Sequence, residues 1–176
     1  ARSRIVLSSK VEAKTSRGAS HQLERALRAL GRDWVDVMLL HYVREPLTRW
    51  SGALDALRKA KQRGEVLTVG LSTHHPRVVQ EGLESGVVDC VFVTLNGAGT
   101  WVEGRGGNPA MIQACRQAAA AGVGVVILKV LGNSELVARK DHALRWAIRR
   151  PFADGVIVGV ETVTQLRETW RAFPTA

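Results

Sequence analysis

Short apolar runs alternate along the chain with longer segments in which apolar residues recur every three or four positions. The short runs predict six buried strands, at residues 4–10, 35–41, 66–72, 89–96, 123–129 and 155–159. The longer segments predict helices, at residues 20–30, 47–63, 76–86, 110–121, 141–150 and 164–173. Strands that alternate with helices are typical of parallel β–α–β units, so the pattern predicts an α/β fold.

Glycine and proline residues predict where several of these helices begin and end. Four helices are expected to end at a glycine, because glycine adopts the left-handed conformation needed there: Gly31, Gly64, Gly86 and Gly122. His75-Pro76 and Asn108-Pro109 predict helix starts, since proline is tolerated at the first helical position and asparagine is a good N-cap. Each helix is therefore expected to stop shortly before the next strand.

Five of the predicted strands end at a polar residue: Lys10, His41, Ser72, Asn96 and Lys129. The carboxyl ends of parallel strands lie at one edge, where (β/α)8 barrels and open α/β sheets place their chemistry. A barrel would collect these residues into a ring. An open Rossmann sheet would need a G-x-G-x-x-G loop after its first strand, whereas residues 104–107 follow the fourth strand and lack that order. Since a barrel needs eight units, six units predict either part of a barrel or an open sheet.

The composition, with 45% hydrophobic residues, is that of a globular protein. No apolar run approaches the roughly 18 to 20 residues that cross a bilayer, so no membrane association is expected. Cys90 and Cys115 lack metal-type spacing, and His74 and His75 lack a third ligand at a suitable distance in sequence. We therefore expect no metal site and two reduced, buried cysteines in a cytoplasmic protein.

The net charge of +9 raises the question of a nucleic-acid partner. The basic residues are spread along the predicted helices and are not interleaved with aromatic residues. This distribution favours solvated helix faces, so no nucleic-acid partner is expected. A basic nucleic-acid-binding domain stays open as an alternative, and a steep salt dependence of DNA or RNA binding would support it.

Six segments, in order, resemble the aldo-keto reductases, and in particular a bacterial branch of aldo/keto oxidoreductases: residues 8–11, 27–41, 56–66, 69–74, 122–132 and 156–168. The likeness covers nearly the whole chain and treats residues 1–176 as one domain. It implies a (β/α)8 TIM barrel, of which this chain holds about six βα units, corresponding to barrel strands three to eight. We therefore expect the natural protein to have two further units before Ala1.

The resemblance also implies a chemistry. The family binds NADP or NAD at the mouth of the barrel and passes a hydride to the carbonyl carbon of an aldehyde or ketone, while a tyrosine protonates the oxygen. Lys10 matches the lysine that pairs with an aspartate beside that tyrosine, and His41 matches the histidine that orients the carbonyl. Ser72 matches the serine of a Ser-Asn pair that holds the nicotinamide, but Thr73 replaces the asparagine and Phe92 replaces a glutamine.

Further cofactor contacts are implied toward the C-terminus. Lys129 is expected to line the pocket or to contact a cofactor phosphate. The segment from Gly159 resembles the loop and helix start that hold the adenosine end, with expected contacts at Gly159, Thr162, Gln165 and Glu168. Many relatives carry a basic residue at the position of Glu161, where a carboxylate would repel a 2′-phosphate, so this residue favours NAD.

The chain departs from the family in its proton donor. The family's aspartate and tyrosine follow the first two barrel strands, which this chain lacks, and the single tyrosine is Tyr42. General acid catalysis needs a donor near the substrate oxygen, so this chain alone is expected to reduce carbonyls poorly. The alternative is a non-catalytic cofactor-binding or structural relative. Exposed strand edges before Arg4 and after Gly159 predict self-association.

Overall fold

The computed structural model describes residues 5–173. One parallel sheet contains six strands: β1 (Ser8–Val11), β2 (Val35–Leu40), β3 (Val66–Thr73), β4 (Cys90–Thr94), β5 (Gly124–Leu128) and β6 (Gly155–Val156). The strands lie in chain order from β1 to β6, and every neighbouring pair is parallel. This arrangement confirms the predicted α/β fold. Arg4, the predicted first residue of the first strand, lies outside the described residues.

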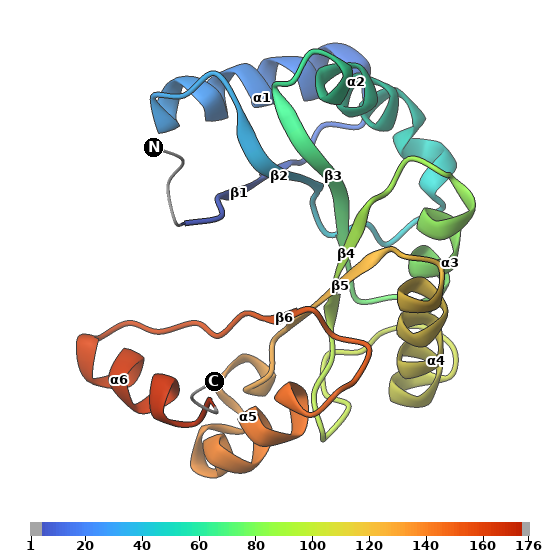
Figure 1. The fold of residues 1–176 in the computed structure, drawn as a ribbon. Coiled ribbons are helices and arrows are strands. Elements are labelled where there is room, and N and C mark those ends of the chain that lie inside the picture. The colour runs from blue at the N-terminus through green and yellow to red at the C-terminus, as the bar shows by residue number, and fades with distance from the viewer. Residues whose placement is uncertain (1–4, 174–176) are drawn as a thin grey trace.

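The helices lie along the outer side of the curved sheet, which leaves an opening between β1 and the β6–α6 side (Figure 1). They are α1 (Ser16–Leu30), α2 (Ser51–Gln62), α3 (Pro76–Glu84), α4 (Gly107–Ala120), α5 (Lys140–Ile148) and α6 (Val163–Arg171). Three short 3-10 turns of the described chain lie between strands and helices: η1 (Leu47–Trp50) precedes α2, and η2 (Gly132–Ser134) and η3 (Val137–Arg139) precede α5. Within residues 5–173, no helix has both the length and the hydropathy required to cross a membrane.

The two faces of the sheet bury different sets of side chains. The face toward the helices carries the large core, which includes Met38, Leu40, Leu71, Val91, Val93 and Ile127. The concave face carries a smaller cluster centred on Leu39, Cys90 and Phe92. Successive side chains of a strand point to opposite faces, so this division follows directly from the apolar runs.

Gly70 of β3 lies in the middle of the concave face, between Leu39 of β2 and Cys90 of β4. A Cβ atom at Gly70 would lie 2.6 Å from both the Cys90 Sγ atom and a Leu39 methyl carbon. Carbon atoms in contact are normally separated by about 3.5 to 4.0 Å, so no larger residue fits there without a shift of its neighbours. The absence of a side chain at Gly70 therefore allows Leu39 and Cys90 to fill this part of the concave face.

Several predicted boundaries are corrected by the structure. α1 begins at Ser16, four residues before the predicted start, because the Thr15 hydroxyl accepts a hydrogen bond from the Gly18 N–H at 3.2 Å and caps the helix. α4 begins at Gly107 with Gly106 as its N-cap, so Asn108 lies inside the helix and is not the cap. β6 is shorter than predicted, because β5 ends at Leu128 and the chain turns at Lys129, which has φ 53°.

The predicted glycines at the helix ends and the proline at the start of α3 are confirmed. Gly31 has φ 61°, and its N–H donates to the Arg28 carbonyl group. The three other predicted glycines also have positive φ, namely Gly64, Gly86 and Gly122. Pro76 occupies the first turn of α3, directly after the N-cap His75.

Candidate functional site at the carboxyl ends of the strands

Three of the predicted site residues lie on the concave face at the carboxyl ends of adjacent strands. Lys10 of β1 is paired in register with Leu39, and Ser72 of β3 is paired with Phe92, so both share the face of the smaller core cluster. His41 directly follows β2, and its N–H donates to the Val11 carbonyl group at 2.8 Å. This bond continues the β1–β2 ladder, and strand alternation places the His41 side chain on the face of Leu39.

The imidazole ring of His41 is oriented by Glu12. His41 Nδ1 lies 2.9 Å from Glu12 Oε1, and Nε2 has no hydrogen-bond partner within residues 5–173. Glu12 therefore engages Nδ1, and Nε2 is left to contact a ligand. His41 lines a pocket of about 480 Å³ together with Glu12, Lys14, Tyr42, Arg44, Glu45 and Trp50.

The side chains of Ser72 and Thr73 both form hydrogen bonds with the turn that follows β2. Ser72 Oγ accepts a hydrogen bond from the Tyr42 N–H at 2.8 Å. Thr73 is fully buried, and alternation along β3 places its side chain on the helix-facing side. Its hydroxyl donates to the Val43 carbonyl group at 2.6 Å and accepts from the His75 N–H at 3.0 Å. A contact between Thr73 and a nicotinamide therefore stays a prediction.

A polar cluster at the same edge of the sheet was not predicted from the sequence. Glu103 Oε1 accepts a hydrogen bond from the Tyr42 hydroxyl at 2.8 Å and lies 3.2 Å from His74 Nδ1. Its second oxygen lies 2.9 Å from His75 Nε2, without hydrogen-bond alignment. The rings of Tyr42 and His74 are 4.6 Å apart. Glu103 is 61 positions from Tyr42, and no local pattern in the sequence joins them.

This cluster changes the pKa of three of its members. The hydrogen bond to Glu103 raises the pKa of Tyr42, and burial adds to that effect. Burial acts to raise the pKa of Glu103, but the hydrogen bond from Tyr42 and the neighbouring histidines outweigh it, so the pKa lies below its usual value. Burial lowers the pKa of His74, and the charge of Lys129 lowers it further. The cluster thus favours a neutral tyrosine, a neutral His74 and an ionised glutamate.

Lys129 and Asn96 organise the loops at this edge. The Lys129 ammonium lies 4.8 Å from the centre of the Trp101 ring, and the Trp101 indole N–H donates to Glu135 at 3.0 Å. Asn96 is fully buried and does not contribute an open polar group to the ring. Its Nδ2 donates to the carbonyl groups of Thr100 (2.9 Å) and Lys129 (3.2 Å). A contact between Lys129 and a cofactor phosphate stays a prediction.

The predicted adenosine-binding residues lie around the exposed start of α6. Thr162 is the N-cap, and its hydroxyl accepts from the Gln165 N–H at 3.1 Å, while the Gln165 side chain accepts from the Glu161 N–H at 2.7 Å. The first bond caps the helix, and the second ties the residue before the cap to the first turn. Glu168 forms an ion pair with Lys140, and Gly159 is exposed. The start of α6 is therefore well formed, and its contact with a cofactor stays a prediction.

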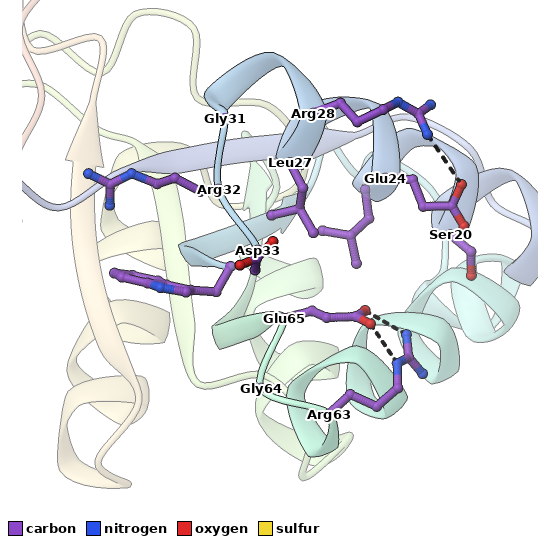
Figure 2. Close-up of a pocket in the computed structure, with 12 residues that line it drawn as sticks. Ser20, Glu24, Leu27, Arg28, Gly31, Arg32, Asp33, Arg63, Gly64 and Glu65 are labelled. Carbon is purple, nitrogen blue, oxygen red and sulfur yellow. Dashed lines mark hydrogen bonds and ion pairs between the residues drawn. The ribbon is translucent and has the colours of Figure 1, made fainter.

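A larger pocket, of about 730 Å³, lies at the opposite end of the sheet, where α1 and α2 lead into β2 and β3 (Figure 2). Its lining includes three arginines and three carboxylates. Arg63 donates two hydrogen bonds to Glu65, at 2.9 and 2.7 Å, and Arg28 lies 4.0 Å from Glu24. Much of the charge in this pocket is therefore balanced internally, and none of the predicted site residues lines it.

Comparisons with known proteins agree with this geometry. A model of the aldo/keto reductase family matches residues 1–142, and the chain therefore belongs to this family. The protein PA4992 from Pseudomonas aeruginosa, named as an aldo-keto reductase, has a structure similar to this chain, with a TM-score of 0.80 and 22% identity over 97% of this chain and 64% of its own. The holo form of aldo-keto reductase AKR11C1 from Bacillus halodurans is also similar, with a TM-score of 0.76 and 16% identity. This match covers 96% of this chain and 67% of that protein.

At these identities the solved structures show the fold. The six units of this chain form part of an aldo-keto reductase (β/α)8 barrel, as the sequence predicted. The chain spans 64% of the length of PA4992. A search of curated proteins found no match.

Proposed function

We propose that the protein is an NAD(P)-dependent oxidoreductase that reduces the carbonyl group of an aldehyde or ketone. The observation that supports this proposal most directly is the placement of Lys10, His41 and Ser72. They lie on one face, at the carboxyl ends of three neighbouring strands, which is the edge where barrel enzymes carry their catalytic groups. Membership of the aldo/keto reductase family supports the same reaction class.

His41 is proposed to orient the substrate carbonyl. Glu12 holds one ring nitrogen at 2.9 Å, which limits rotation of the imidazole and directs the other nitrogen to a ligand. Lys10 makes no ion pair within residues 5–173, and we propose that it lowers the pKa of the tyrosine that donates the proton in the complete barrel. Its charge would favour the tyrosinate that remains after proton transfer.

The residues on the concave face fit a nicotinamide cofactor. Ser72 offers a hydroxyl group, Phe92 offers an apolar ring, and Thr94 has a buried hydroxyl that lacks a partner within residues 5–173. The start of α6 offers backbone N–H groups of the kind that bind phosphate. We propose cofactor contacts at Ser72, Lys129, Gly159, Thr162, Gln165 and Glu168, and a contact with Thr73 through its backbone, because its side chain faces the helices. When bound, the reduced cofactor, NADPH or NADH, would supply the hydride, and the Glu161 carboxylate favours NADH.

A second candidate function is cofactor binding without turnover. It is favoured by the single tyrosine, because the Tyr42 hydroxyl donates to Glu103 and its pKa is raised. A proton engaged in this way is less available to a substrate oxygen. In this alternative the chain keeps the cofactor site but reduces no carbonyl.

Calorimetric titration with NADH and NADPH, followed by absorbance at the wavelength of the reduced cofactor with small aldehydes, separates the two functions. We expect His41→Ala to lower turnover by about 100-fold with little change in cofactor affinity, the lower end of the range for acid–base groups. Lys10→Met should also lower turnover, and Lys59→Met, at an exposed lysine of α2, is its matched control. Turnover is measured in the complete barrel, because this chain alone is expected to reduce carbonyls poorly. There, cofactor binding without turnover would establish the second candidate, and failure to bind either cofactor would refute both.

We also propose that the protein works in the cytoplasm. Cys90 and Cys115 are buried and free. Burial raises the pKa of each thiol to about 12, so both stay protonated and unreactive. Buried thiols without a disulfide are typical of proteins from reducing compartments.

A further inference from the structure

The pocket beside His41 contains a cation that the proposed function does not use. Arg44 follows His41 by three positions and lines the same pocket of about 480 Å³. A molecule of modest size can therefore contact both side chains. The contacts and the rigidity of Arg44 therefore affect which carbonyl compounds this pocket can bind.

The turn that carries Arg44 is held rigidly against the end of β3. Tyr42 has φ 49°, a left-handed conformation that is strained for a bulky residue. Three hydrogen bonds hold it: the Tyr42 N–H donates to Ser72 Oγ at 2.8 Å, the Val43 N–H donates to the Ser72 carbonyl group at 2.8 Å, and the Thr73 hydroxyl donates to the Val43 carbonyl group at 2.6 Å. The backbone next to Arg44 is therefore fixed before a ligand binds.

Arg44 is the cation in this pocket that has no carboxylate partner within residues 5–173. Glu45 is engaged by Lys14 and also lies 3.6 Å from Arg49, and Glu12 is held by His41. The Arg44 guanidinium lies 4.9 Å from the centre of the Tyr42 ring and is exposed. Arg44 also interacts with the Tyr42 hydroxyl, but a guanidinium carries five N–H groups, so others remain for bonds to a carboxylate.

We propose that Arg44 binds an anionic group of the substrate, so that this pocket selects carbonyl compounds that also carry a carboxylate. His41 contacts the carbonyl oxygen, and Arg44 contacts the carboxylate at the other end of the same small molecule. This inference rests on the proposed function, since it assigns the substrate class of that site. Because the turn is fixed in advance, little ordering opposes the binding of the anion.

The test compares two aldehydes of similar shape, 4-carboxybenzaldehyde and its neutral methyl ester, methyl 4-formylbenzoate. Dissociation constants are measured by calorimetry for the wild-type chain, for Arg44→Ala and for Arg116→Ala, an exposed arginine of α4 that serves as the control. We expect the wild type to bind the carboxylate about tenfold more tightly than the ester, the gain of one charge-assisted contact. Arg44→Ala should bring the two constants within twofold, whereas Arg116→Ala should keep the preference.

Three results would overturn the inference: equal binding of both aldehydes by the wild type, a preference that survives Arg44→Ala, or binding of neither compound. The proposed function is tested separately, by oxidation of the reduced cofactor with the neutral ester as substrate. Turnover of the ester without preference for the carboxylate would refute the role of Arg44 and leave the oxidoreductase function standing. In the complete barrel, preferential binding of the carboxylate without turnover of either aldehyde would refute the oxidoreductase function and leave the role of Arg44 standing.

Discussion

Replacement of Asn96 by alanine should destabilise the protein by removing the bonds that hold the loop after β4. The Asn96 side chain is fully buried. Its Nδ2 donates to the Thr100 and Lys129 carbonyl groups at 2.9 and 3.2 Å, and its Oδ1 accepts from the Ala98 and Thr100 N–H groups, both at 3.2 Å. Four backbone groups therefore lose a hydrogen bond when the amide is removed, although the Lys129 carbonyl group keeps its bond from the Gly132 N–H at 2.8 Å.

The expected loss of stability follows from which of these groups water can reach. Each bond contributes about 1 kcal/mol net, and more where the partner stays buried. Ala98 is exposed, so its N–H can bond to water instead. Counting the two bonds donated by Nδ2 in full and the two accepted by Oδ1 at half, the free energy of unfolding should fall by about 3 kcal/mol.

Urea denaturation followed by circular dichroism measures this change. Gln113→Ala, at an exposed amide of α4, is the control and should change the free energy of unfolding by less than about 0.5 kcal/mol. Limited proteolysis should also cut Asn96→Ala faster within residues 97–106. A loss below about 1 kcal/mol, with cleavage as slow as in the wild type, would refute the structural role of Asn96.

Three further predictions concern other parts of the molecule. Thr94→Val should raise the free energy of unfolding, measured by urea denaturation, by about 1 kcal/mol, because the buried Thr94 hydroxyl lacks a partner within residues 5–173. The control Thr68→Val should not raise it. A destabilised Thr94→Val would contradict this. The folded state lowers the pKa of His74, so the unfolded chain binds more protons than the folded chain as the pH falls through 6.5, and the free energy of unfolding should fall there by at most about 1.4 kcal/mol per pH unit from this residue. Denaturation measured at several pH values should show a flatter slope for His74→Gln. An unchanged slope would argue against this role of His74. The apolar side chains of α6 are exposed, with Trp170 at 72%, so the chain should self-associate in sedimentation experiments and Trp170→Lys should weaken this; a monomer at all concentrations would exclude it.

The sequence predicted the strands and most helices because their signals are local. Alternation and apolar runs depend on neighbouring residues, and the predicted order of six βα units is confirmed. The start of α1 was wrong because Gly18 and the polar residues around it gave no helical pattern, while the cap at Thr15 depends on one side-chain bond. The role of Asn108 was also wrong, since its side chain donates to the Asn96 carbonyl group, 12 positions earlier.

The candidate site was predicted only in part, for a similar reason. Lys10, His41 and Ser72 could be placed from the ends of their strands. Alternation alone separates Ser72 from Thr73, because adjacent residues of a strand face opposite sides. Glu103 was missed because its partners, Tyr42, His74 and His75, lie far away in sequence and are brought to it by the parallel register.

The missing side chain at Gly70 has a consequence for how this protein can diversify. Leu39 and Cys90 fill the space beside it, in register with Lys10, so the concave face is closely packed at this level. We therefore expect a ligand to bind above this layer, at the carboxyl ends of the strands. Longer substrates must extend outward, over the turn at residues 41–45 and the loop at residues 97–106. New substrate ranges are therefore expected to arise by changes in those two segments, while the layer formed by Leu39, Gly70 and Cys90 stays constant.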